Sequence, residues 1–441
     1  MTLQGKINVL QRLVIAAFWL LFSLLGFWHF YAIWRTAVDV PILDEWFLFE
    51  KDGLILGWSS KFLFAFQNEH RLLITRIFYW LNYQIFDLNF KYQIIFDVFL
   101  FAAMVAMSYW LIVRKNGLQG NLAALLGLGV FATNLPYEIH SWAVLSNMAV
   151  VMTALLVGTY LLFYSKNSLV LGLACLLFFL AIYSFAGAMS AVVVIIFFYV
   201  SASILEWQPR RVIQSLVVAA AIVLSIGLWF LDYQKNPGHP PYQMPWSVPF
   251  WDYFIELTSL GFGYTQPNRW ISWLCLFLVV LSLGAALYRS RQFKQDSSAI
   301  LFLSVFCLGV LAMMASISLG RAGFGVFQAK SSRYSMLPMF LPMLSVAFFS
   351  FVPKLRMFGA TAVGLVVVFG IWDNFSMEQY YKIRSDRLQG RYCLKKLYLR
   401  PETNPTGVCP KITIPIDLKE PLERARKLQV NFVRSWQRPF R

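Results

Sequence analysis

The ionisable residues of this chain gather in one stretch, 39–76, that follows the first apolar segment. The chain has only 21 acidic residues, and His70 and Arg71 follow directly after one of them, Glu69. Carboxylates, an imidazole and a guanidinium can move protons and hold anions, and such groups beside a membrane are candidates for function. We therefore expect the functional site to include this stretch. Its acids are Asp39, Asp44, Glu45, Glu50, Asp52 and Glu69.

Asp44 and Glu45 are adjacent carboxylates at the start of a predicted helix, 43–54, which ends near Gly53. A carboxylate can act as a general base at an acceptor hydroxyl when the geometry places it there. Adjacent residues on a helix point about 100° apart, so one would take the proton and the other would orient a neighbour. The alternative is structural: both charges would stabilise the helix dipole. Taken without the rest of the loop, the two interpretations are about equal.

A second helix is predicted after Asn68, which suits the N-cap position. Glu69 and Arg76 are seven residues apart and would share one face of this helix. With Trp80 nearby, the amphipathic pattern is typical of a helix that lies in the membrane interface. Its apolar positions recur every four residues and are Leu73, Ile77, Leu81 and Ile85.

His70 and Arg71 are candidate ligands at the start of this second helix. Arg71 could bind a lipid-linked phosphate or pair with an acid of the first cluster. His70 is a candidate substrate contact or metal ligand, but no second His or Cys stands at a metal-ligand spacing. Since a lone His is more often simply hydrogen-bonded, a divalent metal is the less favoured interpretation, and no other cofactor is predicted.

A third group of polar residues lies in 320–334, before a late apolar segment. A serine that caps this segment would place Lys330 and Arg333 at a helix amino terminus, where the dipole disfavours cations. A bound anion removes the conflict, because free N–H groups and two cations suit a phosphate. Arg321, Lys330 and Arg333 are therefore candidate phosphate ligands, and Tyr334 is a candidate substrate contact. The alternative is contact of these cations with lipid headgroups.

Two weaker pairs complete the candidates. Glu138 precedes His140 in one loop, and Asp232 precedes His239 in another. If the loops lie on the same side of the membrane, the two pairs would line one cavity. Glu138 and His140 are kept as candidate substrate contacts, although ordinary loop polarity explains all four residues equally well.

The composition indicates a membrane protein. Hydrophobic residues make up 59% of the chain and charged residues only 13%, whereas a soluble chain carries roughly 25% charged residues. A net charge of +17 is explained by basic cytoplasmic loops and contact with anionic lipid, so we expect no nucleic acid partner. The first apolar run is too long and too aromatic for a secretory signal and is interpreted as a true span.

The apolar runs predict an all-α polytopic fold with about eleven transmembrane helices, each near the ~20 residues that a bilayer requires. Lysine and arginine occur in every loop on one side, which places the N-terminus in the cytoplasm. The first loop (36–91), the segment 232–269 and the C-terminus would then lie outside. The predicted spans are 13–35, 92–113, 119–135, 143–164, 168–184, 187–204, 212–231, 270–288, 299–318, 335–352 and 356–372.

The regions between and after the spans suggest two domains. A transmembrane domain, 1–372, includes a first loop with two juxtamembrane amphipathic helices. The segment 232–269 is rich in proline and aromatic residues and is predicted to be an ordered lid or acceptor-facing loop. The basic tail, 373–441, is too polar to span and is expected to form a small strand-and-helix cap. If the tail lies in an oxidising compartment, Cys393 and Cys409 could form a disulfide.

This layout resembles the GT-C superfamily of polytopic membrane glycosyltransferases, which use polyprenyl-phosphate-linked sugar donors. The shared features are a cytoplasmic N-terminus, a first outside loop of two juxtamembrane helices with an early acid, and an extracytoplasmic C-terminal part. The Asp44-Glu45 dipeptide is similar to the acidic pair of protein O-mannosyltransferases. The runs around His70 and Arg333 also look like those of uncharacterised bacterial membrane proteins placed near this superfamily. The chain departs from the family in its small tail and in lacking an evident metal set.

The resemblance implies an enzyme of the bacterial inner membrane that moves a sugar from undecaprenyl phosphate, or a related carrier, to an acceptor hydroxyl on the outer face. The acceptor would be a glycan, a lipid or a protein. Asp44 would be the base, with Glu45 and Glu69 in supporting roles. One alternative is a transporter or flippase of lipid-linked sugars, which should carry its ionisable residues at mid-membrane. Another is an O-antigen polymerase or ligase, which would need Arg321 and Arg333 but no acidic first loop.

Overall fold

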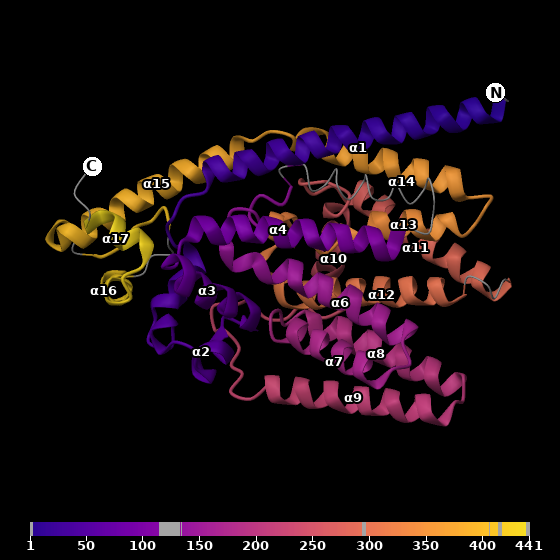
Figure 1. The fold of residues 1–441 in the computed structure, drawn as a ribbon, viewed down its shortest axis with the longest axis horizontal. Helices are drawn as coiled ribbons and strands as arrows, with labels where there is room; N and C mark the ends of the chain where they lie inside the picture. Colours follow the sequence, from indigo (N-terminus) through magenta and orange to yellow (C-terminus); the bar gives the residue numbers. More distant parts are fainter. Residues whose placement is uncertain are drawn as a thin grey trace.

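The computed structural model is a bundle of α-helices, most of which have their axes roughly along the longest axis of the molecule (Figure 1). It describes residues 3–113, 133, 135–292, 297–404, 406–412 and 417–437. Within these residues, the strand structure is limited to one short hairpin. The predicted all-α fold class is therefore confirmed.

Within the residues that the structure describes, six helical segments are long and apolar enough to cross a membrane, which identifies the chain as a membrane protein by length and composition. Uncharged apolar runs of about 20 residues form helices in lipid because a helix satisfies its own backbone hydrogen bonds. The six segments contain α4 (Phe90–Ser108), α6 (Ser146–Tyr164), α8 (Ala188–Leu205), α9 (Pro209–Trp229), α11 (Arg269–Gln292) and α12 (Ser297–Arg321).

The expected number of eleven spans is not confirmed. The described part of the chain contains three further apolar helices that are shorter, namely α7 (Ser168–Ile182), α13 (Phe340–Ser350) and α14 (Arg356–Ile371). α13 begins at Phe340 rather than at 335, since turns occupy the residues around Pro338, whose ring restricts the preceding backbone. The predicted span 13–35 lies within α1 (Leu3–Thr36). The predicted span 119–135 lies almost wholly outside the described residues.

α6 and α12 form the centre of the bundle. About two thirds of the most apolar stretch of each helix is buried, against 22% for α9. The close packing is visible at Gly158 of α6, where an added Cβ would lie 2.7 Å from the ring of Phe178 on α7. α9 instead exposes Val217 and Val223, an apolar surface suited to lipid.

The first loop is folded, but its first helix is shorter than predicted. In place of a helix over 43–54, the chain forms the 3-10 helices η1 (Leu43–Phe49) and η2 (Leu54–Leu56), followed by α2 (Ser60–Phe64). Gly53 lies between η1 and η2, where an added Cβ would lie 2.3 Å from the carbonyl oxygen of Leu48. This close approach requires a glycine, and it ends the helical turn.

The second predicted helix is present as α3 (Leu73–Phe86). Its apolar residues Leu81 and Ile85 are exposed, whereas Thr75 and Asn82 on the other face are buried in the protein. This inverse arrangement fits a helix whose apolar face contacts lipid. The predicted position in the membrane interface therefore remains consistent with the pattern of exposure.

The start of α3 differs from the prediction. Asn68 is not its N-cap: the helix begins after Leu72, and Asn68 lies in the turn of a hairpin formed by β1 (Phe66–Gln67) and β2 (His70–Arg71). The φ of Asn68 is 51°, a left-handed conformation that asparagine tolerates. Glu69 also belongs to this turn, so the predicted shared helical face of Glu69 and Arg76 is wrong.

The segment 232–269 is ordered, as predicted, and contains a helix of its own. α10 (Val248–Leu260) is buried along most of its length, including Tyr253 and Glu256. Irregular turns precede it, and Gln243 of these turns donates from its backbone N–H to the Leu319 carbonyl of α12 at 2.8 Å. The segment is therefore attached to the bundle at the end of α12.

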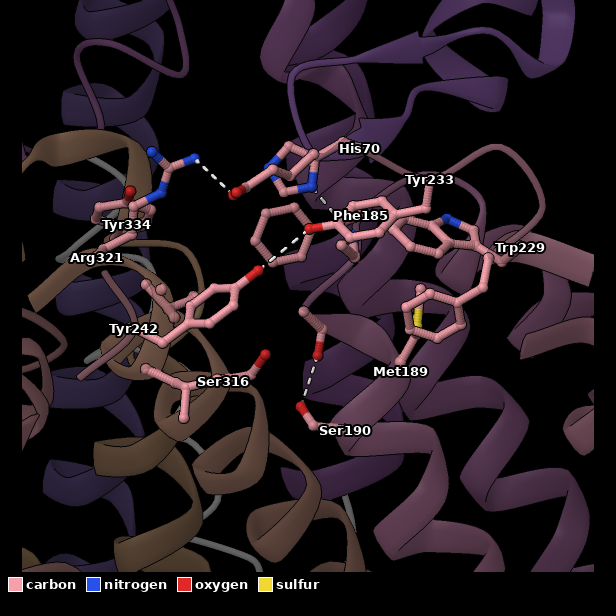
Figure 2. Close-up of a pocket in the computed structure, with 17 residues that line it drawn as sticks. His70, Phe185, Met189, Ser190, Trp229, Tyr233, Tyr242, Ser316, Arg321 and Tyr334 are labelled. Atoms are coloured by element: carbon pink, nitrogen blue, oxygen red, sulfur yellow. Dashed lines mark hydrogen bonds and ion pairs between the residues drawn. The ribbon is translucent and has the colours of Figure 1, made fainter. Parts of the chain in front are cut away.

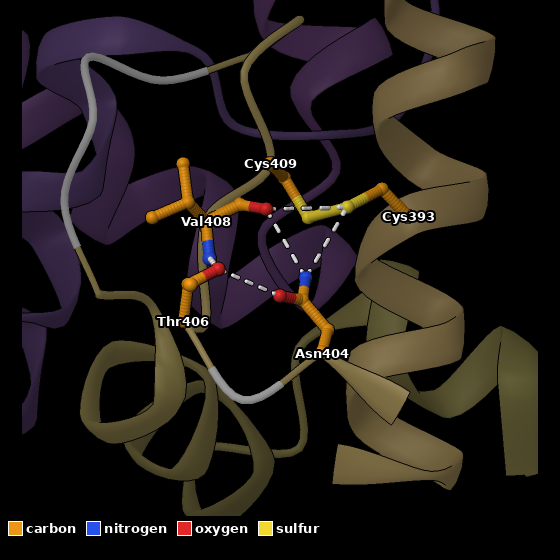
Figure 3. Close-up of a disulfide and its surroundings, with 5 residues drawn as sticks. All are labelled: Cys393, Asn404, Thr406, Val408 and Cys409. Atoms are coloured by element: carbon orange, nitrogen blue, oxygen red, sulfur yellow. Dashed lines mark hydrogen bonds between the residues drawn. A yellow bond between two sulfur atoms is a disulfide. The ribbon is translucent and has the colours of Figure 1, made fainter. Parts of the chain in front are cut away.

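The tail is helical rather than a strand-and-helix cap. Its described residues form α15 (Glu378–Leu399), α16 (Lys419–Lys427) and α17 (Asn431–Gln437), and Cys393 and Cys409 form a disulfide (Figure 3). The tail packs on the first loop: the Asn431 side chain donates to the Asp39 carboxylate at 2.6 Å. Both regions lie at one end of the molecule, opposite the N-terminus (Figure 1).

Candidate functional site

A cavity of about 340 Å³ opens where the hairpin meets the bundle. Its walls come from the amino end of α8 and the carboxyl ends of α9 and α12, which bring residues far apart in the sequence together (Figure 2). Glu69, His70 and Arg321 lie at one side, and the rest of the lining is mainly apolar. The apolar wall includes Phe185, Met189, Trp229, Phe230 and Ile317.

Glu69 joins the hairpin to two other segments of the cavity. Its carboxylate lies 3.1 Å from Nδ1 of His239 and 3.9 Å from the Arg321 guanidinium. Arg321 is also 3.3 Å from Nε2 of His239. The three side chains are largely buried. Their mutual contacts place one acid, one imidazole and one guanidinium at the polar side of the cavity.

Asp44 faces the same group of charges. The side-chain amide of Asn68 donates to Asp44 at 3.5 Å, and Asn236 donates to Asn68 at 3.1 Å. Burial raises the pKa of Asp44, while the positive charges of Arg333 and Arg321 oppose the rise. The predicted base and two of the predicted phosphate ligands are therefore brought together by the fold.

His70 is a neutral lining residue. Its Nδ1 accepts a hydrogen bond from the Ala186 backbone N–H at 3.2 Å, and its ring stacks on Phe185. Burial, with the charges of Arg321 and His239, lowers the pKa of His70 to about 3. Because Nδ1 accepts, the proton of the neutral ring is on Nε2, which can donate to a ligand.

Glu138 supports the third polar segment instead of lining the cavity. One of its carboxylate oxygens accepts hydrogen bonds from the Ser331 and Ser332 hydroxyls at 2.8 and 2.9 Å. The same oxygen accepts from the Arg333 backbone N–H at 3.0 Å. The prediction that one of these serines caps the next span is wrong. Both serines instead attach this segment to Glu138, which positions Arg333.

Three tyrosines line the cavity. The hydroxyls of Tyr233 and Tyr242 are 3.2 Å apart and meet within it (Figure 2). Tyr334, a predicted substrate contact, also lines the cavity. Sequence reasoning did not select Tyr233, Tyr242 or Asn236. The signal that could have found them is their presence in the proline- and aromatic-rich segment 232–269, which was predicted to be ordered.

Glu45, which was predicted to support Asp44, lies in a buried structural position beside it. Its carboxylate is 2% exposed and accepts hydrogen bonds from the Tyr79 hydroxyl and from the Ile42 and Val144 backbone N–H groups. Burial raises the pKa of Glu45 to about 7. Glu45 therefore holds the first loop together and supports the segment that carries Asp44.

Lys330 is not free to bind a phosphate. Its ammonium group is buried and lies 2.9 Å from the Glu256 carboxylate on α10. It also donates to the Glu256 carbonyl at 2.8 Å and to the Ser259 hydroxyl. With three protein acceptors around its three N–H donors, Lys330 attaches the segment 320–334 to α10. We remove it from the candidate phosphate ligands.

Arg71 and His140 also make contacts away from the cavity. Arg71 donates to the backbone carbonyls of Phe64, Trp229 and Leu231 and therefore ties the hairpin to the end of α9. His140 is fully buried and packs against the rings of His29 and Phe101. Neither residue lines the cavity that contains Glu69 and Arg321.

The described residues bring together no group of three or more His, Cys, Asp and Glu side chains that could hold a metal ion. Comparison with known proteins identifies no family model that matches this chain and no curated protein that is similar to it. The function is therefore inferred from the site itself. Its distinctive feature is the pairing of Glu69 with Arg321 at one side of a cavity whose remaining walls are mainly apolar.

Proposed function

We propose that this protein is an integral membrane glycosyltransferase that moves a sugar from a polyprenyl-phosphate donor to an acceptor hydroxyl. The observation that carries the proposal is the composition of the cavity. Glu69 and Arg321 line its polar side, and the remaining walls are mainly apolar. Asp44 lies beside this side of the cavity, bonded to Asn68 and within reach of the charges of Arg321 and Arg333. A lipid-linked sugar phosphate matches this arrangement, because its phosphate and sugar are polar and its isoprenoid tail is apolar.

The arginines suit the phosphate of such a donor. Arg321 lies on the cavity wall, and Arg333 is directed by the attachment of its backbone to Glu138. When the sugar leaves, negative charge grows on the phosphate, so nearby cations stabilise the transition state more than the ground state. A guanidinium can meet two phosphate oxygens at once, which a lysine cannot do.

The apolar part of the cavity suits the carrier lipid. Its walls come from α8, α9 and α12, and α9 is the least buried of the six long apolar helices in the described chain. An isoprenoid tail could reach the cavity past α9 without crossing the centre of the bundle. Burial of the tail would contribute to affinity at about 25 cal/mol per Å² of apolar area.

Asp44 is the proposed base. In a single displacement, the acceptor oxygen bonds to the anomeric carbon, and the bond between that carbon and the phosphate oxygen breaks. The phosphate leaves with the bonding electrons, and the hydroxyl proton passes to the carboxylate. Glu69 is already engaged with His239 and Arg321, whereas Asp44 accepts only a long hydrogen bond from Asn68 among the contacts described for its carboxylate. Glu69 would then orient the arginine.

The proposed location is the outer face of a bacterial inner membrane, with undecaprenyl phosphate or a related polyprenyl as the carrier. The disulfide of the tail supports this side, because disulfides persist in oxidising compartments. The tail packs on the first loop, which contributes Asp44 and Glu69, so the site and the disulfide share one side. The acceptor hydroxyl would belong to a glycan, a lipid or a protein.

A transporter or flippase of lipid-linked sugars is less well supported. Such a carrier should hold its ionisable groups at mid-membrane, in broken helices. Here Glu69 lies in a hairpin turn, Asp44 and Arg333 lie in short 3-10 helices, and Arg321 is the last residue of α12. A polymerase or ligase of O-antigen type would use the arginines but not the acids, and the contact between Glu69 and Arg321 favours a site that needs both.

The test is a transfer assay with purified protein and a panel of polyprenyl-phosphate sugars. A glycosyltransferase should release polyprenyl phosphate in the presence of an acceptor extract. A carrier reconstituted in vesicles should move the intact donor without releasing it. A polymerase or ligase should require a pyrophosphate-linked glycan and should release polyprenyl pyrophosphate. Absence of polyprenyl phosphate release with every donor would exclude the proposed function.

A further inference from the structure

The C-terminal tail is bonded to both ends of η1, the helix that carries Asp44. The backbone N–H of Leu43, the residue before Asp44, donates to the Ile412 carbonyl at 2.6 Å. At the other end, the Arg424 guanidinium donates to the Phe49 carbonyl at 3.0 Å. The tail therefore contacts the proposed base through one peptide unit, without contributing a side chain to the cavity.

Leu43 depends on support from outside its own segment. Its φ is 45°, a left-handed conformation that a non-glycine residue holds only when its surroundings impose it. The Leu43 side chain is itself 40% exposed, so its packing supplies little of that support. The hydrogen bond to Ile412 is a direct restraint on this backbone and, through it, on the direction of Asp44.

Ile412 is held in place by α15 in two ways. The segment 406–412 is joined to α15 by the disulfide between Cys409 and Cys393 (Figure 3). One turn before Cys393, Gly390 lies against Ile412, and a Cβ added at Gly390 would be 2.1 Å from the Ile412 Cγ2 atom. The position of the Ile412 carbonyl therefore depends on one covalent bond and on one glycine.

We infer that the segment 406–412, which the disulfide joins to α15, is a positioning element for Asp44 and acts on it through the Leu43 backbone. The inference rests on the proposed function for its catalytic consequence, but the restraint on Leu43 is a property of the fold alone. Loss of the restraint should free η1 at its start, whereas the arginines that bind the donor phosphate are held by other contacts. The turnover rate should therefore fall, and the affinity for the donor should stay the same.

Hydrogen exchange measured by mass spectrometry on the full chain in detergent tests the restraint without any activity. In the Cys393→Ala/Cys409→Ala variant, the Leu43 amide should exchange at least about 10-fold faster, since its acceptor is no longer fixed. Peptides of α8 should be unchanged. Cys175→Ala, which removes a thiol from α7, is the matched control and should leave Leu43 protected. Unchanged protection of Leu43 in the double variant would overturn the inference.

A second variant tests the hydrogen bond between Leu43 and Ile412 and leaves the disulfide intact. Gly390→Ala should displace Ile412 and accelerate exchange at Leu43, and Ile412→Ala added to it should restore protection by removing the clashing methyl group. Gly364→Ala is the control, because nothing lies within 4 Å of an added Cβ at Gly364 of α14. If Gly390→Ala leaves Leu43 protected while the disulfide variant does not, Ile412 is not the point of contact and the inference is wrong.

The catalytic consequence is tested by measuring kcat and KM separately, because only kcat should change. In both variants, kcat for the polyprenyl-phosphate sugar should fall by up to roughly 100-fold, the scale of a misplacement of about 1 Å. KM for the donor should stay within about 2-fold, because the phosphate contacts are intact. Faster exchange with unchanged kcat would refute the positioning role and leave the proposed function standing. An inactive native protein would refute the proposed function, while the exchange result would still decide the restraint.

Discussion

The carboxylate of Glu138 accepts a hydrogen bond from the Arg333 backbone N–H at 3.0 Å. A residue expected to contact substrate is thus used to hold the backbone of a candidate phosphate ligand. The charge of the Arg333 guanidinium also acts on Asp44, where it opposes the rise in the pKa. A carboxylate near an arginine can therefore serve the site through the main chain instead of by pairing with the guanidinium.

Asp44→Asn is the first test of the proposed base. The amide keeps the size of the side chain and its contact with Asn68, so folding and donor binding should be retained. Turnover should fall by roughly 100-fold or more, the usual contribution of a general base. The measurements are kcat with a polyprenyl-phosphate sugar and the thermal transition of the variant.

Glu69→Gln is the comparison for that experiment. If Asp44→Asn keeps near-normal turnover and Glu69→Gln does not, the two acids must exchange roles. If neither substitution matters, the first loop is not catalytic.

The dependence of turnover on pH follows from the environment of Asp44. Burial raises its pKa, and a base works only when deprotonated, so kcat should be lost on the acid side at a higher pH than the roughly 3.9 of a free aspartate. The charge of Arg333 opposes this rise. Arg333→Ala should therefore move the acid limb to still higher pH, as measured by kcat at saturating donor.

A control for this shift is Arg211→Ala, at the opposite end of α9 from the cavity. It should leave the acid limb where it is in the native protein. An acid limb that is the same in Arg333→Ala and the native protein would show that a group other than Asp44 controls the rate.

The sequence predicted local structure where the pattern was periodic. The four-residue spacing of Leu81 and Ile85 predicted α3, and both side chains are exposed along the helix. The predicted start of that helix was wrong, because asparagine is favoured both at an N-cap and in a hairpin turn. The pairing of Phe66 with Arg71 in the hairpin, which no single-residue preference encodes, decided between the two.

The candidate site was predicted in part. Asp44, Glu69, Arg321 and Arg333 were selected by type and position, and the fold brings them together. Lys330 was misassigned because its partner, Glu256, lies on a different element, α10, and the sequence around Lys330 does not indicate a buried ion pair. His239 was noted only as a weak candidate. Its contact with Glu69 depends on the path of segment 232–269 over the end of the bundle.

The burial of Lys330 predicts a loss of stability rather than a loss of donor binding. Lys330→Ala would leave the Glu256 carboxylate buried without its counter-charge, which should cost about 3–5 kcal/mol. The Lys330→Met/Glu256→Gln variant removes both charges and should recover most of that loss. The measurements are the midpoint of thermal unfolding and the affinity for undecaprenyl phosphate. A stable double variant that has lost this affinity would restore Lys330 as a phosphate ligand.

The packing of the tail on the first loop predicts their topology. Accessible reporters at Asn68, Gln243 and the C-terminus should all be labelled from the outside of intact cells, because the first loop, the segment 232–269 and the tail are predicted to lie on the same side of the membrane. Cys393 and Cys409 should resist alkylation until they are reduced. A C-terminal reporter that is labelled only from the cytoplasm would reverse the proposed orientation, and free thiols in the native protein would exclude the disulfide.

The phosphate contact of Arg321 and Arg333 is tested by substituting each with alanine and with lysine. A desolvated pairing with phosphate should cost roughly 2–5 kcal/mol of donor binding on truncation to alanine, whereas a lipid headgroup contact would cost about 1 kcal/mol. Lysine should restore part of the binding, since it keeps the charge but loses the planar two-point contact. Arg291→Ala, at the far end of α11, is the matched control and should bind the donor normally. The measurements are the Kd for undecaprenyl phosphate and kcat, with the native thermal transition as a check of folding. Normal binding and turnover in both alanine variants would mean that these cations serve the membrane surface and not the reaction.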